Sequence, residues 1–323
     1  MVLVDDFGSV DDVRAGLSAT AAGRAAAIRA RETVPTGRGV VAVLIGPEAP
    51  LDAAGIHALP DLRIVAATSA GTDHVDVAAA TSAGAWVTSA AGYCTAEVAE
   101  HAIALILDLL RGVTRLDRAV RAGRWDVREA APRRVAGAVL GLIGFGRTGR
   151  AVARLALGLG LRVLAHDPSP AGSVFTAAGV VRCGTLGELL AEADVVSVHA
   201  PLKPGAPPIL DAAAIAGLRP GAFVVNVARG GLLDTAALGA ALATGRVAGA
   251  ALDVLPVEPP PPHHPVRGFP ATVITPHAAW YSADALVRPY RWAGAAVAAI
   301  LAGTEPDPAC GRVVGRPERL VGR

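Results

Sequence analysis

Three residues in the second half of the chain have side chains suited to acid–base chemistry on a small anionic molecule. Each of them follows an apolar run that is typical of a β-strand. They are Arg229, Glu258 and His277. Because the carboxyl ends of parallel strands meet at one edge of a sheet, we expect these side chains to open into one cleft.

Together with a hydride donor, these groups could reduce a 2-oxo acid. The guanidinium fork of Arg229 can bind the carboxylate and polarise the neighbouring carbonyl. His277 can give a proton to the carbonyl oxygen, because an imidazole titrates near neutral pH. Glu258, if hydrogen-bonded to the other ring nitrogen, would orient His277 and favour its protonated form. Taken singly, the three are more readily explained as a salt-bridge arginine, a surface acid and a loop histidine.

The donor is indicated by the stretch 139–150, in which an apolar run ends in Gly-x-Gly-x-x-Gly and a helical pattern follows. Gly144 permits a sharp turn, Gly146 lets the backbone approach a pyrophosphate, and Gly149 lets the helix pack closely on the strand. The N–H groups of the first helical turn would then face the phosphates. This order of strand, turn and helix predicts a dinucleotide site.

The second strand of this unit, 162–166, ends at Asp167, which lies 18 residues beyond Gly149. A carboxylate at this distance accepts hydrogen bonds from the adenosine ribose and repels a 2′-phosphate. No arginine follows it directly, so the sequence favours NAD over NADP. The competing interpretation is an ordinary strand–helix turn with a surface aspartate.

Composition describes a globular protein and excludes several other classes. The chain has 323 residues, of which 52% are hydrophobic and 18% charged, a size that suggests two domains. The net charge of +2 has its signs interspersed, which does not favour nucleic acid as a partner. Three scattered cysteines indicate a reducing cytoplasm rather than a disulfide framework. Neither a signal peptide nor a membrane span is expected, and the pair His263–His264 in a proline-rich loop does not predict a metal site.

The rest of the chain reads as two α/β units. Residues 1–94 alternate short strands and helices. Within this segment, the small residues of 68–76 have two interpretations. They either expose backbone N–H groups to a ligand or form a plain loop in which Asp73 or Asp76 caps a helix. A single amphipathic helix is expected from Thr95 to about Val120. The polar segment 121–134 could reach a neighbouring subunit or be a solvated connector.

A second run of strands and helices occupies 137–280. Residues 284–302 are again helical. The tail from Thr304 has no periodicity, and we expect little order in it.

Over nearly its whole length the chain resembles the D-isomer-specific 2-hydroxyacid dehydrogenases. The resemblance rests on the glycine turn with Asp167 and on three further motifs, which are Val-Asn-Val-Ala-Arg-Gly-Gly-Leu-Leu-Asp at 225–234, Gly-Ala-Ala-Leu-Asp-Val at 249–254 leading to Glu258-Pro259, and Thr-Pro-His-Ala-Ala-Trp-Tyr-Ser at 275–282. The branch that it resembles most is the one containing the C-terminal binding proteins. One departure is Ala67, where that branch carries an arginine before the substrate loop.

The resemblance implies an α/β fold in which a Rossmann dinucleotide-binding domain is inserted in a smaller flavodoxin-like substrate-binding domain. The implied boundaries are 1–97 and 284–323 for the substrate-binding domain, and 98–283 for the NAD-binding domain. It further implies an NAD-dependent oxidoreductase acting on a D-2-hydroxy acid and its 2-oxo acid, with Arg229, Glu258 and His277 as the catalytic residues. The family is usually dimeric, so a cytoplasmic homodimer is expected.

The resemblance also assigns the binding residues. Those for the cofactor are Ile143, Gly144, Gly146, Arg147, Thr148, Gly149, Asp167, Ala200, Pro201, Val227, Ala228 and Asp253, the last on the nicotinamide carboxamide. Those for the substrate are Ala70, Gly71, Arg229, His277 and Trp280. A different class of function stays open at this point, because the corepressor members of the branch keep the same residues and use NAD to fix a dimer that binds peptides.

Overall fold

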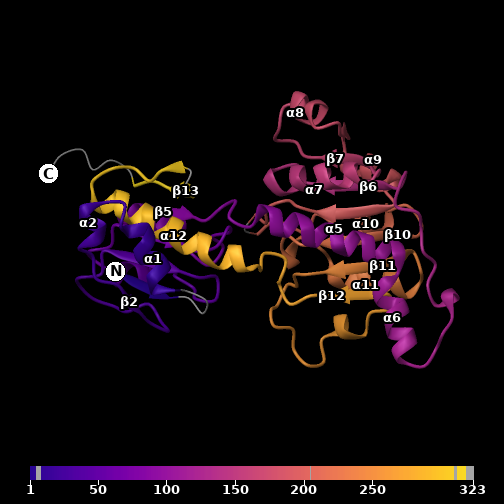
Figure 1. Cartoon of the computed structure of the whole chain (residues 1–323), viewed down its shortest axis with the longest axis horizontal. Helices are drawn as coiled ribbons and strands as arrows, with labels where there is room; N and C mark the ends of the chain where they lie inside the picture. The colour runs from indigo at the N-terminus through magenta and orange to yellow at the C-terminus, as the bar shows by residue number, and fades with distance from the viewer. Residues whose placement is uncertain (5–8, 204, 309–310, 318–323) are drawn as a thin grey trace. The chain divides into compact units, whose positions relative to one another are not determined.

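The computed structural model describes residues 1–4, 9–203, 205–308 and 311–317. The chain divides into two compact units, coloured along the sequence in Figure 1. Unit 1 comprises Met1–Cys94 and Tyr281–Arg323, and unit 2 is Thr95–Trp280. Cys310, one of the three cysteines, lies outside the described residues.

Unit 1 is built on a six-stranded sheet. Its strands are β1 (Val2–Val4), β2 (Arg29–Ala30), β3 (Ala42–Ile45), β4 (Ile64–Ala67), β5 (Trp86–Ser89) and β13 (Arg312–Gly315). They lie in the order β13-β5-β4-β3-β1-β2, and all neighbouring pairs are parallel except β13 with β5. The order of the first five strands along the chain is flavodoxin-like, as the resemblance implied.

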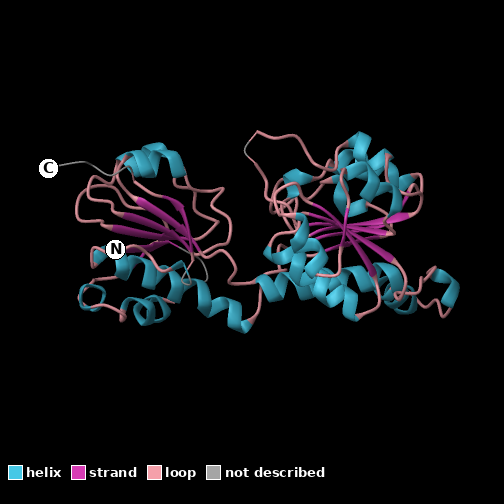
Figure 2. Ribbon diagram, turned by 90° about the horizontal axis from the view of Figure 1, so that it is seen from above, coloured by secondary structure: helices cyan, strands magenta, loops and turns pink. Residues whose placement is uncertain are grey.

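Helices lie on both faces of this sheet, as Figure 2 shows. They are α1 (Val10–Leu17), α2 (Ala21–Arg24), α3 (Ala53–His57), α4 (Val77–Ser82) and α12 (Ala283–Leu301). Asp76 caps α4 by accepting a hydrogen bond from the Ala79 N–H at 2.8 Å, so the capping interpretation of that residue is confirmed. Helix α1 can approach α12 closely because a side chain at Gly294 would collide with the carbonyl of Val13.

Unit 2 is built on a seven-stranded sheet that is parallel throughout. Its strands are β6 (Val139–Ile143), β7 (Arg162–His166), β8 (Val181–Arg182), β9 (Val195–Val198), β10 (Ala222–Asn226), β11 (Val247–Leu252) and β12 (Thr272–Ile274). The order β12-β11-β10-β9-β6-β7-β8 is that of a doubly wound dinucleotide-binding domain with one strand added at the edge. The predicted Rossmann architecture is therefore confirmed.

Seven α-helices cover this sheet in the described part of unit 2. They are α5 (Thr95–Arg111), α6 (Val113–Arg121), α7 (Arg147–Gly158), α8 (Gly172–Ala177), α9 (Leu186–Glu192), α10 (Ala212–Ala216) and α11 (Thr235–Ala243). Three short 3-10 helices, η1 (Val127–Glu129), η2 (Gly230–Leu232) and η3 (Pro265–Gly268), lie in the connections.

The core of unit 2 is split by the sheet into two layers. Along β6, Leu140 and Leu142 join the cluster beneath α5 and α7, whereas Val139 and Ile143 join the opposite cluster with α9 and α11. Alternate side chains of a strand point to opposite faces, so a continuous apolar strand is required wherever both faces are covered. This burial fixes the strand ends that carry the candidate site.

Two expectations from the sequence are wrong. The single helix from Thr95 to Val120 is interrupted at Gly112, which adopts a left-handed φ of 67° between α5 and α6. A side chain at Gly112 would lie 2.7 Å from Ala130 Cβ. The tail beyond Thr304 is also more ordered than expected, because its residues 312–315 form β13 on the edge of β5. The elements α1, α2, α8, β2 and β8 were not expected from the sequence.

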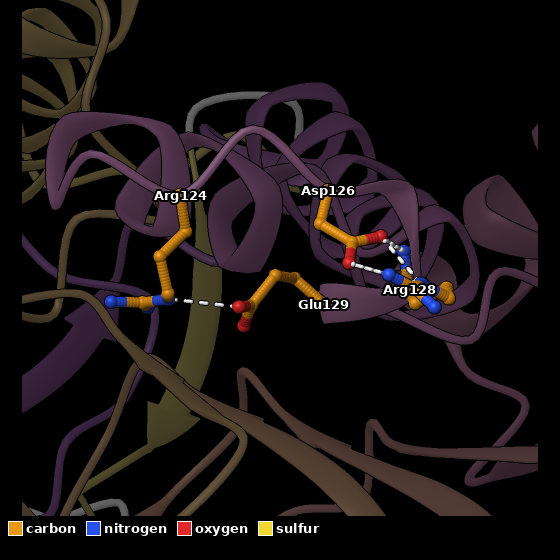
Figure 3. A network of polar contacts seen from close by, with 4 residues as sticks. All are labelled: Arg124, Asp126, Arg128 and Glu129. Carbon is orange, nitrogen blue, oxygen red and sulfur yellow. Dashed lines mark hydrogen bonds and ion pairs between the residues drawn. The ribbon is translucent and has the colours of Figure 1, made fainter.

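The segment after α6 is held by ion pairs on the surface (Figure 3). Arg124 Nε donates to Glu129 Oε1 at 2.8 Å, and the guanidinium of Arg128 binds the Asp126 carboxylate. Exposed pairs of this kind contribute little to stability. Nearby, Trp125 is 90% exposed and Val127 83% exposed, an unusual display of apolar surface.

Among the described helices, none combines the length and apolar character needed to cross a membrane.

Candidate active site

The glycine turn after β6 has three positions that differ in their surroundings. Gly144 has a φ of 96°, and a Cβ there would lie 2.7 Å from the carbonyl carbon of His199. A Cβ at Gly149 would lie 2.3 Å from the Gly144 oxygen, so this helix position must be glycine for α7 to start so close to the turn. A Cβ at Gly146 would meet nothing within 4 Å. The backbone at Gly146 is therefore open, as a turn that admits a pyrophosphate must be.

This turn lies at the point where the strand order reverses. Strand β6 pairs in parallel with both β7 and β9, and ligands of doubly wound sheets bind in the crevice at such a switch point. Ile143 is the last residue of β6, and Ala200 and Pro201 follow β9 after His199. Helix α7 begins at Arg147, with Gly146 as its N-cap and no side chain capping it. Its first turn can therefore offer N–H groups to an anion.

The carboxylate of Asp167 is fixed beside this turn. Its Oδ2 accepts a hydrogen bond from the Phe145 N–H at 2.8 Å, and its Oδ1 accepts one from the Ser169 N–H at 2.9 Å. A carboxylate can accept about four hydrogen bonds, so both oxygens keep capacity for ribose hydroxyls. The turn and Asp167 together fit a dinucleotide without a 2′-phosphate.

The structure brings His277 and Glu258 together. His277 Nδ1 lies 2.6 Å from Glu258 Oε2, while Glu258 Oε1 accepts a hydrogen bond from the Leu255 N–H at 2.7 Å. Partial burial pushes the pKa of Glu258 upward, but the hydrogen bond from His277, the Leu255 N–H and the charges of His277 and Arg229 outweigh it. The pKa is therefore lowered overall, and the carboxylate is the stable form.

Arg229 follows β10 and belongs to the same group, since its charge acts on Glu258. Its Nη1 donates to the Ala228 carbonyl at 2.8 Å. The fully buried Asn226 shapes this turn by accepting from the Ala228 N–H at 3.1 Å and donating to the Arg229 carbonyl at 2.9 Å. Asn226 lies within the motif at 225–234, which by itself gives the residue no role. Its signal was an amide at the end of an apolar strand.

The carboxylate of Asp253 has several hydrogen-bond partners within the protein. Its side chain has no solvent exposure. Oδ1 accepts from the Thr275 hydroxyl at 2.6 Å and from the Ala278 N–H at 2.8 Å, and Oδ2 accepts from the Ala279 N–H at 3.0 Å. In this structure the carboxylate binds the loop that carries His277.

The remaining predicted residues are spread over both units. Thr148 lies in the first turn of α7, and Val227 follows β10 within the buried core. Ala70 and Gly71 follow β4 in unit 1, where the Ser69 hydroxyl donates to the Gly71 carbonyl at 2.7 Å. Trp280 is the last residue of unit 2 and is partly exposed. Within the described ranges, no group of three or more metal-binding side chains is found.

The fold and the turn with Asp167 define a dinucleotide-binding protein, and comparison with known proteins defines its family. Residues 103–279 match the family model described as "D-isomer specific 2-hydroxyacid dehydrogenase, NAD binding domain". The chain belongs to this family, and NAD is its cofactor.

Individual relatives agree with this assignment. An (S)-sulfolactate dehydrogenase of Chromohalobacter salexigens is 35% identical over 86% of this chain and 91% of its own length. A D-3-phosphoglycerate dehydrogenase of Archaeoglobus fulgidus is 37% identical over 74% of this chain, a match that spans only 45% of that longer protein. The crystal structure of a protein from Thermus thermophilus superposes with a TM-score of 0.82 at 32% identity, covering 94% of this chain and 97% of that one.

Proposed function

We propose that the protein reversibly reduces a 2-oxo acid to the D-2-hydroxy acid with NADH. The observation that carries this proposal is the 2.6 Å pair of His277 and Glu258, which lies with Arg229 at strand ends of the dinucleotide-binding sheet. A clamp for a carboxylate, a proton donor and a hydride donor are the three groups that the reaction needs.

NADH supplies the hydride when it is bound. Arg229 binds the substrate carboxylate and draws electron density from the adjacent carbonyl. His277 would give the proton of its Nε2 to the carbonyl oxygen of the substrate, and Glu258 would stabilise the imidazolium before this transfer. Oxidation reverses the sequence, with neutral His277 accepting the hydroxyl proton.

The substrate side chain is proposed to be apolar or aromatic. The indole of Trp280 supports this proposal, as does the lack of a basic side chain at Ala67, the last residue of β4. A phosphorylated hydroxy acid or phosphite is disfavoured for the same reason. The names of the two relatives point to different acids, so they support the reaction class rather than one substrate.

Ala70 and Gly71 are proposed to contribute backbone N–H groups to the substrate carboxylate, which makes unit 1 the substrate-binding domain. The proposed boundaries remain 1–97 and 284–323 for the substrate-binding domain and 98–283 for the NAD-binding domain. Asp253, Val227 and Ala228 keep their proposed place beside the nicotinamide as part of the wall of the site.

NADH consumption with a panel of 2-oxo acids tests the proposal, with His277→Gln as the matched variant. Turnover of at least one acid, lost in the variant while NADH still binds, is the expected result. If no acid is turned over although NADH binds tightly, the enzyme proposal fails.

The second candidate is an NAD-sensing, dimeric binding protein similar to the corepressors of the resembled branch. It is favoured by the exposed Trp125 and Val127, which offer apolar surface to a second copy or a peptide. Arg229→Ala separates the two proposals, because lost turnover with unchanged partner binding supports the enzyme, whereas unchanged turnover with lost partner binding contradicts it. A homodimer and a cytoplasmic location are proposed for either function.

A further inference from the structure

We propose that His101 is a positioning residue for His277, acting through Thr275 and Asp253. The inference rests on the proposed function only in taking His277 as the acid–base group. His101 lies on α5, more than 170 positions before the loop that it contacts, and no role follows for it from the motifs around Arg229, Glu258 and His277.

The backbone of His277 needs support from its neighbours. Its φ of 53° places it in the left-handed region, which only His277 and Ala271 enter among the described non-glycine residues. A residue with a Cβ adopts this conformation at a cost, unless the surrounding structure imposes it. Any loosening of this turn would therefore move the imidazole away from Glu258.

Asp253 imposes the turn from both sides of His277. Its carbonyl accepts a hydrogen bond from the His277 N–H at 2.8 Å. Its carboxylate binds the Thr275 hydroxyl before His277 and the N–H groups of Ala278 and Ala279 after it. One buried side chain thus joins β11 to three residues of the loop after β12.

A fully buried carboxylate requires partners that offset the loss of hydration. His101 supplies the partner from outside the loop, since its Nε2 lies 3.1 Å from Thr275 Oγ1 and 3.6 Å from Asp253 Oδ1. The imidazole is itself only partly exposed. In its protonated form it would place a positive charge within ion-pair distance of the carboxylate.

The hydroxyl of Thr275 fixes the direction of this chain of hydrogen bonds. It has a single proton, which it donates to Asp253 over 2.6 Å because an ionised carboxylate only accepts. It must therefore accept a proton from His101, so Nε2 of His101 carries hydrogen. The order His101, Thr275, Asp253 then has every donor matched to an acceptor.

Helix α5 makes His101 a rigid support. The residues Ala102 and Ile106 on the same helix are completely buried in the core of unit 2. The helix therefore cannot shift without disturbing that core. His101 thus ties the loop of His277 to the buried core of unit 2.

The test compares His101→Leu with His101→Gln in the full-length protein. Leucine removes the donor to Thr275, whereas the glutamine amide can still donate. We expect His101→Leu to lower kcat by on the order of tenfold or more, with the NADH Kd within about threefold of wild type, and His101→Gln to recover most of kcat. In a Thr275→Val background, His101→Leu should have no further effect, because the link is already broken. Glu100→Gln, an exposed change on the same helix, is the matched control.

Amide hydrogen exchange of the peptide 275–280 provides a readout that needs no turnover. Faster exchange in His101→Leu, with wild-type exchange in His101→Gln and Glu100→Gln, supports the inference even if no substrate is found. Unchanged exchange in His101→Leu overturns it. An equal loss of kcat in the leucine and glutamine variants also overturns it, as does a loss confined to NADH affinity. If the wild-type protein turns over no acid, the proposed function fails, and the exchange experiment decides the role of His101 separately.

Discussion

His199 should make the stability of unit 2 sensitive to mild acid. Burial lowers the pKa of this imidazole from 6.5 to about 4. Its Nδ1 has no hydrogen-bond partner among the described residues and is closed to solvent, while Nε2 lies 2.9 Å from the Ser197 hydroxyl. Because the folded pKa is depressed, the folded protein does not bind a proton that the unfolded chain accepts. Stability is therefore complete above pH 6.5 and is lost as the pH falls toward 4.

The size of the loss follows from the two pKa values. Lowering the pH from 7.5 to 5 should reduce the free energy of unfolding by at most about 2 kcal/mol through His199. This figure is an upper limit because part of the residue remains solvent-exposed. The assay is urea unfolding of the NAD-free wild type and of His199→Gln at both pH values. The contributions of the other titrating groups cancel when the two proteins are compared. Glutamine can keep the bond to Ser197 without titrating. The wild-type midpoint should fall by roughly 1 M urea more than that of the variant. Parallel behaviour of the two proteins, or a larger loss in the variant, would refute the reasoning.

Three further predictions concern the site itself. Gly149→Ala should weaken NADH binding by on the order of tenfold or more and lower the melting temperature, because the added Cβ would collide with the Gly144 carbonyl; wild-type affinity measured by NADH fluorescence would contradict this. Asp167→Ser should raise the ratio of NADPH to NADH kcat/KM by about tenfold or more by removing the charge that repels a 2′-phosphate, and an unchanged ratio in steady-state assays would disprove it. Glu258→Gln should lower kcat far more than it raises the NADH Kd, since it removes the charge that holds His277, and the idea fails if kcat is retained across the pH range.

The strands that carry the site could be predicted closely from the sequence. The ranges 139–143, 195–198 and 272–274 are apolar runs between turn signals, and each forms a strand with those bounds. Burial on both faces makes such runs continuous, so local sequence contains the information. The apolar runs before Arg229, Glu258 and His277 likewise sufficed to predict that each residue follows a strand of the dinucleotide-binding domain, whereas the adjacency of those strands is seen only in the structure.

Other features depend on contacts between distant residues. The apolar period of α5 continues through Gly112 into α6, so it could not reveal a break that is set by the approach of Ala130. The strand β13 is only four residues long and exists because β5 offers it an edge. The sequence also could not predict that Asp253 is buried beside His101. Helix α5 and the loop after β12 are separated in the chain by all seven strands of the sheet, so only the folded structure shows that they are in contact.

The most direct test of the central claim follows the hydride itself. The protein is mixed with NADH deuterated at the reactive C4 position and with the best 2-oxo acid of the panel, and the product is analysed by mass spectrometry and chiral separation. The proposed reaction predicts one deuterium at C2 of the D-hydroxy acid, and none in a parallel reaction with His277→Gln. A product without deuterium at C2, or deuterium in the L-hydroxy acid, would contradict it.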